Sequence, residues 1–141
     1  MTYDVYGWVE VAEQSQESNT WHGVLDLSKV VGHPNEVSLS LFGLSKRINP
    51  QDTSPAFAER GLPTNLSSEA RESLKGILDL ENQEIEHYGF HGFSHATLAE
   101  IKQISIASNT SWDLVLKLIA DIQRKLQFTD TQIRVVVWAL W

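Results

Sequence analysis

The chain has 141 residues, of which 42% are hydrophobic and 21% charged, with no cysteine and a formal net charge of −7. The length and composition predict one globular domain over residues 1–141. The negative charge argues against binding to duplex nucleic acid, which needs a basic surface. Without cysteine, disulfides and thiolate zinc sites are excluded. No apolar run reaches the roughly 18 residues of a membrane-spanning helix, and residues 1–6 lack the features of a signal peptide, so we expect a cytoplasmic protein without membrane contact.

The N-terminal half predicts two strands and then a long irregular segment. Tyr3–Val11 alternates apolar and polar residues, which indicates a strand, and Thr20–Leu27 is a second candidate. Asn35 could cap a short helix over Glu36–Leu44, although a strand also fits that pattern. Residues 45–66 contain three prolines and show no regular pattern. A loop of this length in a compact domain is often functional.

The C-terminal half predicts three helices and a final strand. A helix begins at Ser67 or Ser68 and runs to about Leu80. Thr97 and Glu100 have the spacing of a capping box, and a longer amphipathic helix follows from Thr110 to about Gln127. Residues 133–141 are apolar on both faces, as in a central strand. The expected fold is α+β: a small, mainly antiparallel sheet that includes the N- and C-terminal strands, packed with three to four helices.

The most distinctive stretch is residues 87–95, which hold three of the five histidines, three aromatic residues and two glycines. The glycines argue against a helix. In an extended segment, side chains alternate between the two sides, so His87, His91, Phe93 and His95 would share one surface. Such a surface fits a binding wall, and it fits equally the polar edge of a sheet.

Five segments in order resemble an uncharacterised family of phage and bacterial proteins that opens with Asp-Ile-His-x-x-x-Glu and closes with Val-Arg-Leu-Val-Phe-Trp. The matching segments are Asp4–Glu10, Leu41–Arg47, Arg60–Pro63, His91–Glu100 and Ile133–Trp138. Tyr6 stands where the family has His, which removes a metal or catalytic role from that position. The resemblance implies an α+β fold and a phage or prophage origin, hence a bacterial host cell. Small phage proteins often act against bacterial defence, some by sequestering nucleotide immune signals.

The leading hypothesis is a small-molecule-binding protein without catalytic activity, resident metal or cofactor, which sequesters an anionic, nucleotide-derived ligand. The expected ligand-binding residues are Arg47, Arg60, Tyr88, His91, Phe93 and His95. The arginines would hold phosphate, the histidines would form hydrogen bonds, and the aromatic rings would stack on a base. Each residue also has a structural alternative: the arginine at 47 could cap a helix, the one at 60 could pair with a carboxylate, and the rings could fill the core. The five tryptophans also allow a contact between copies of the chain, in a homo-oligomer.

Two other hypotheses compete with this one. A metal-assisted hydrolase would use His87, His91, His95 and Asp4 as ligands and would lose activity to chelators. A protein-binding inhibitor or immunity protein would use the acidic surface against a basic partner. The inhibitor predicts tryptophans exposed together on one face.

Overall fold

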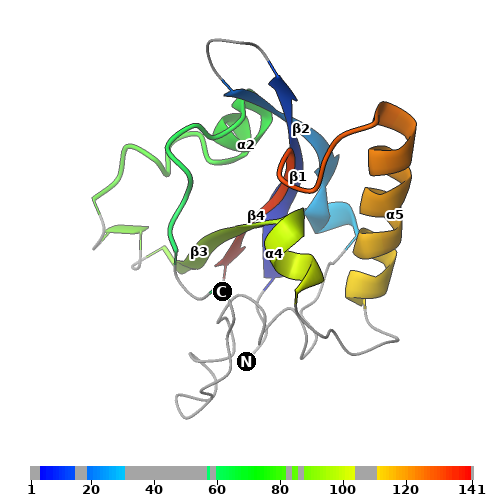
Figure 1. Ribbon diagram of the computed structural model, residues 1–141. Helices are drawn as coiled ribbons and strands as arrows, with labels where there is room; N and C mark the ends of the chain where they lie inside the picture. The colour runs from blue at the N-terminus through cyan, green and yellow to red at the C-terminus, as the bar shows by residue number, and fades with distance from the viewer. Residues whose placement is uncertain are drawn as a thin grey trace.

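The computed structural model describes residues 4–14, 19–30, 57, 60–81, 84–85, 88–103 and 111–140. In chain order the elements are β1 (Asp4–Gln14), β2 (Asn19–Asp26), the 3-10 helix η1 (Leu27–Lys29), α2 (Ser68–Ser73), β3 (Phe90–Thr97), α4 (Leu98–Lys102), α5 (Ser111–Leu126) and β4 (Ile133–Leu140). The strands form one antiparallel sheet in the order β2-β1-β4-β3 (Figure 1). The predicted α+β fold is confirmed. No described helix is long and apolar enough to cross a membrane.

The C-terminal strand β4 occupies an inner position because its side chains are apolar on both faces. It pairs with β1 on one side and β3 on the other, and seven of its eight residues are buried. Val135 and Val137 pack with Val115 and Ile119 of α5 on one face of the sheet. Val136 and Trp138 pack with α2 on the opposite face. Helices thus cover both faces (Figure 1), and we call these the α5 face and the α2 face.

The helices follow their predicted starts more closely than their predicted ends. The capping box at the start of α4 is present: the Thr97 hydroxyl accepts from the Glu100 amide, and the Glu100 carboxylate accepts from the Thr97 amide. The predicted end of α2 near Leu80 is wrong, because the helix ends at Ser73. Gly76 follows with φ of +84°, a conformation that stops a right-handed helix. The helix predicted over residues 36–44 lies outside the described residues.

A β-bulge in β3 changes which side chains share a surface. The register pairs are Phe90–Leu140, His91–Ala139, Ser94–Val137 and His95–Val136, with an irregularity between His91 and Ser94. Gly92 has φ of +70°, and one extra residue in this stretch reverses the alternation of side chains. His91 therefore lies on the α5 face, with Ala139, whereas His95 lies on the α2 face, with Val136. The prediction of one shared surface is wrong for His91, whereas Phe93 and His95 both lie on the α2 face. His87 lies outside the described residues.

Candidate ligand site at the outer edge of strand β3

Three residues of the segment before α2 are held against the outer edge of β3. The amide of Gly61 donates to the carbonyl of Phe93 at 2.9 Å, and the carbonyl of Gly61 accepts from the His95 ring at 2.9 Å. The Ser94 hydroxyl donates to the carbonyl of Phe57. Gly61 has φ of +79°, which favours glycine at this position. These contacts bring Arg60 beside His95, although the two are far apart in sequence.

The guanidinium of Arg60 is fixed by three contacts and remains partly exposed. Its Nη1 lies 2.7 Å from Oε2 of Glu100 and 3.5 Å from the carbonyl oxygen of His95, and the group lies over the ring of Phe57, 4.7 Å from the centroid. The side chains of Arg60 and Glu100 are 35% and 37% exposed. The structural alternative of pairing with a carboxylate is therefore realised, but the cation still reaches solvent.

Glu100 is charged in this arrangement and is the main competitor for any anion. Burial opposes its ionisation, but hydrogen bonds from the Thr97 amide and from Arg60 outweigh that effect and hold the pKa of Glu100 below its ordinary value. A ligand phosphate would have to share or replace this carboxylate on Arg60.

The hydrogen bond of His95 determines what its other ring nitrogen can offer. A carbonyl oxygen only accepts, so Nδ1 carries the proton that binds the carbonyl of Gly61. In the neutral ring Nε2 is then an acceptor, suited to a hydroxyl or amine of a ligand. It becomes a donor for phosphate only when the ring is protonated.

The structure brings two of the six predicted ligand residues, Arg60 and His95, beside each other. Phe93 contacts the same segment through its carbonyl, while its ring packs against the apolar cluster of the α2 face. Tyr88 is 62% exposed and lies in the turn that precedes β3, seven residues before His95. His91 donates through Nδ1 to the carbonyl of Gly89 at 3.0 Å, on the other face. Arg47 lies outside the described residues.

The metal-ligand set of the hydrolase hypothesis is not assembled by the described residues. Among them, no group of three His, Asp or Glu side chains is placed to hold a metal ion. His91 and His95 point to opposite faces of the sheet, and His87 is not described.

The tryptophans whose side chains are described do not form the exposed face that the inhibitor hypothesis expects. Of the three whose side chains are described, Trp21 and Trp138 are buried. Trp8 is half-buried, and its indole nitrogen donates to the hydroxyl of Ser73 at 2.9 Å.

A buried ion pair that sequence reasoning missed anchors the other end of the segment carrying Arg60. Nε of Arg134 lies 2.7 Å from Oε1 of Glu10, and the two side chains are 6% and 0% exposed. Oε2 of Glu10 accepts from the Ser67 amide at 2.8 Å. The remaining guanidinium nitrogens donate to the side chain and the carbonyl of Asn65, and the group stacks on Trp21 at 3.9 Å. The signal in the sequence is Arg134, the single charged residue of the otherwise apolar strand β4.

This network matters because residues 60–67 are thereby fixed at both ends. Gly61 is bound to β3, while Asn65 and Ser67 are bound to the charged pair in the sheet. Burial lowers the pKa of Arg134, and its hydrogen bond with Glu10 acts in the opposite direction. Both charges are compensated, as buried charges must be. The Arg-Gly-Leu-Pro segment therefore has a defined position on the molecule.

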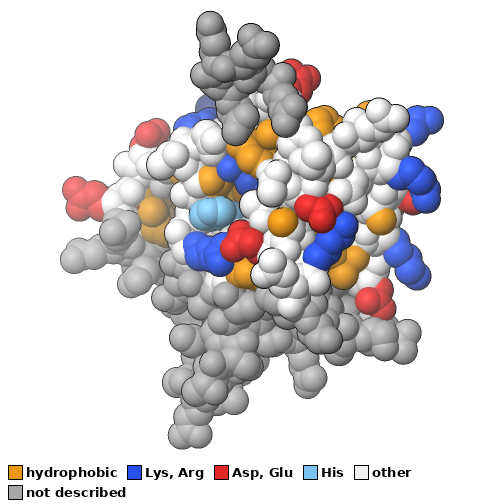
Figure 2. Space-filling view, viewed as in Figure 1, with side chains coloured by type: hydrophobic (Ala, Val, Ile, Leu, Met, Phe, Trp, Pro, Cys, Tyr) orange, Lys and Arg blue, Asp and Glu red, His pale blue; other side chains and the backbone are white. Residues whose placement is uncertain are grey.

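The surface at this edge carries charges of both signs. In the view of Figure 2, a histidine side chain reaches the surface, with basic and acidic side chains beside it. The described ion pairs nearby are Arg60–Glu100 and Lys102–Asp130. No protein-family model, no curated protein and no solved structure matches this chain.

Proposed function

We propose that this protein binds and sequesters a small anionic, nucleotide-like ligand at the outer edge of β3 and does not convert it. The observation that supports this proposal is the guanidinium of Arg60, which is positioned by Glu100 and Phe57 yet about one third exposed. An arginine held in this way can present two parallel N–H groups to a phosphate without losing much conformational entropy on binding.

Each neighbouring residue has a distinct part in this proposal. Arg60 binds a phosphate in partial exchange for Glu100. His95, whose Nδ1 donates to the carbonyl of Gly61, accepts at Nε2 from a hydroxyl or amine of the ligand. Tyr88, exposed at the start of β3, stacks on a base. A dinucleotide, which has two bases and more than one phosphate, offers separate groups for Tyr88 and for Arg60. Arg47 is proposed as a second phosphate ligand.

The setting that we propose follows the resemblance to phage and prophage proteins. The protein would act in the cytoplasm of a bacterial host, where it would lower the free concentration of a nucleotide immune signal. The same proposal includes a homo-oligomer, since several copies would present several sites.

The direct test is calorimetric titration with mononucleotides, cyclic dinucleotides and inorganic phosphate, using wild type, Arg60→Gln and Arg124→Gln. Arg124 is the matched control, because it also pairs with a carboxylate, Asp121, but its side chain is 80% exposed on α5. A charge-assisted hydrogen bond contributes about 1.5–3 kcal/mol, so Arg60→Gln should weaken binding at least roughly tenfold. Arg124→Gln should bind like wild type. Equal binding by all three proteins, or recovery of a chemically altered ligand, contradicts the proposal.

A further inference from the structure

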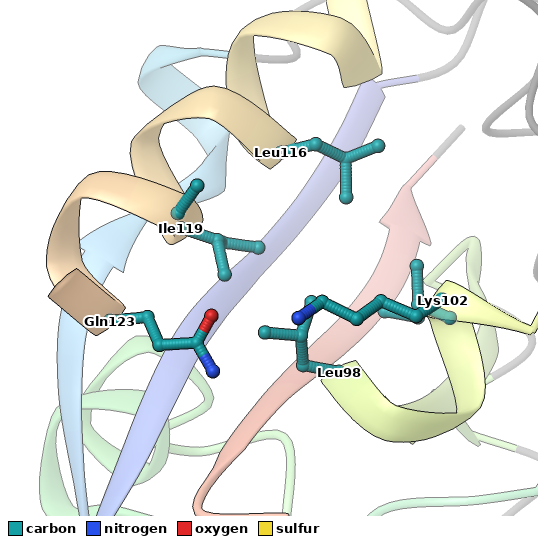
Figure 3. A pocket seen from close by; sticks show the side chains of 7 residues that line it. Leu98, Lys102, Leu116, Ile119 and Gln123 are labelled. Carbon is teal, nitrogen blue, oxygen red and sulfur yellow. The ribbon is translucent and has the colours of Figure 1, made fainter. Parts of the chain in front are cut away.

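A cavity lies between α4 and α5, and none of the site residues Arg60, Phe93 and His95 lines it. Its volume is about 330 Å³, within the range of small-molecule sites. The residues that line it are Leu98, Ile101, Lys102, Leu116, Ile119, Ala120 and Gln123. Figure 3 shows side chains from the two helices facing each other across this space.

The floor of the cavity is apolar and belongs to the core of the α5 face. Leu98, Ile101 and Ile119 are buried there, Leu116 is half-buried, and Ala120 lies at the exposed rim. An apolar group placed on this floor would leave water at a gain of about 25 cal/mol for each Å² of apolar surface buried. At about 30 Å³ for each water-sized group, the cavity has room for roughly ten non-hydrogen atoms.

The polar groups at the mouth come from both helices and converge on one oxygen. Nζ of Lys102 and Nε2 of Gln123 donate to Oδ1 of Asp130, at 2.8 and 2.6 Å. Figure 3 shows the Lys102 amine and the Gln123 amide approaching each other from opposite sides. The hydrogen bond from Lys102, followed by the one from Gln123, lowers the pKa of Asp130. The carboxylate is therefore charged, and it balances the charge of Lys102.

We propose that this cavity binds an uncharged amphiphile with an apolar body of about eight carbons and one hydroxyl or carbonyl head group, a size set by the cavity volume. The mouth has no net charge but offers further donors on Lys102 and an amide oxygen on Gln123, which can pair with a neutral head group. A charged head group would be attracted by one of Lys102 and Asp130 and repelled by the other. It would also lose its hydration. The proposal does not depend on ligand binding at Arg60.

The test is calorimetric titration of the intact protein with 1-octanol, octanoate and octylamine, which gives the dissociation constant of each. Ala120→Phe fills the cavity from its exposed rim, and Leu114→Phe adds a ring to α5 at an exposed residue outside the lining. We expect saturable binding of 1-octanol to wild type and to Leu114→Phe, and at least tenfold weaker binding to Ala120→Phe. Octanoate and octylamine should bind several-fold more weakly than 1-octanol.

Three results would overturn the proposal: no saturable binding of 1-octanol, equal binding by Ala120→Phe, or tighter binding of octanoate. A second measurement needs no variant and so does not depend on the folding of Ala120→Phe. Amide chemical shifts of the wild-type protein should change on adding 1-octanol at residues 98–102 and 116–123. Changes confined to other elements would contradict the assigned cavity.

Discussion

His91 and His95 lie on opposite faces of the sheet, although they belong to the same strand and are separated by only three residues. His91 is the register partner of Ala139 on the α5 face, and His95 is the partner of Val136 on the α2 face. In a regular strand, residues four apart share a face. The bulge beside Gly92 removes that relationship and leaves only His95 beside Arg60.

This separation predicts different effects for two conservative substitutions. His95→Gln should weaken binding of the nucleotide-like ligand by roughly fivefold to tenfold, the equivalent of about 1–1.4 kcal/mol for one neutral hydrogen bond. His91→Gln should leave binding within twofold of wild type, because its side chain is on the other face. The measurement is the dissociation constant of each variant by calorimetry. Equal losses in both variants would show that the ligand does not distinguish the two faces.

The buried pair of Glu10 and Arg134 should dominate the stability of the molecule. Arg134→Met leaves the carboxylate of Glu10 buried without its counter-charge, which costs about 3–5 kcal/mol in the free energy of unfolding. Arg124→Met removes a cation whose side chain is 80% exposed, and surface pairs contribute at most about 1 kcal/mol. Urea denaturation of the two variants tests this difference. A loss below 1 kcal/mol for Arg134→Met would contradict the central role of the pair.

Substituting two glycines that have positive φ distinguishes the cost of backbone strain from the cost of steric clash. At Gly7 (φ +155°) an added Cβ would lie 2.0 Å from the carbonyl oxygen of Val136, whereas at Gly76 (φ +84°) it would meet nothing within 4 Å. Gly7→Ala should therefore cost about 2–4 kcal/mol from strain and overpacking together, and Gly76→Ala about 1–2 kcal/mol from strain alone. Chemical denaturation provides both values. Equal losses would mean that the sheet moves aside at Gly7 without cost.

The loss of stability at acidic pH should depend on Glu100. Its folded pKa is below the ordinary value of 4.5, so it contributes stability that is present above that pH and is lost as the pH falls through the folded pKa. The thermal midpoint of wild type should thus fall more steeply below pH 4.5 than that of Glu100→Gln, which has no carboxylate to protonate. Thermal melts at intervals from pH 7 to pH 3 test this, and parallel profiles for the two proteins would contradict it.

Local signals in the sequence were sufficient for most elements of the fold. The alternation of β1, the apolar faces of β4 and the Thr97–Glu100 capping box each depend on residues close in sequence, and all three were predicted. The end of α2 was missed, because a single glycine at position 76 weakens a helix without requiring a stop. The bulge in β3 was missed for a similar reason: Gly92 permits it, but only pairing with β4 fixes it.

The candidate site was predicted in its residue types more than in its arrangement. Arg60 and His95 were named, but their proximity depends on Gly61, which binds the edge of β3 through contacts distant in sequence. Pairing of Glu10 with Arg134 likewise requires the β1–β4 register, which no short pattern encodes.

In the function that we propose, Arg60 holds an anionic ligand that the protein does not convert. The most direct test of this claim is native mass spectrometry of freshly purified wild type and Arg60→Gln, each compared with its denatured mass. We predict extra mass on the wild type that denaturation releases as an intact nucleotide-like molecule, and no such mass on Arg60→Gln. The same extra mass on both proteins, or wild type free of ligand even after incubation with nucleotides, would contradict the claim.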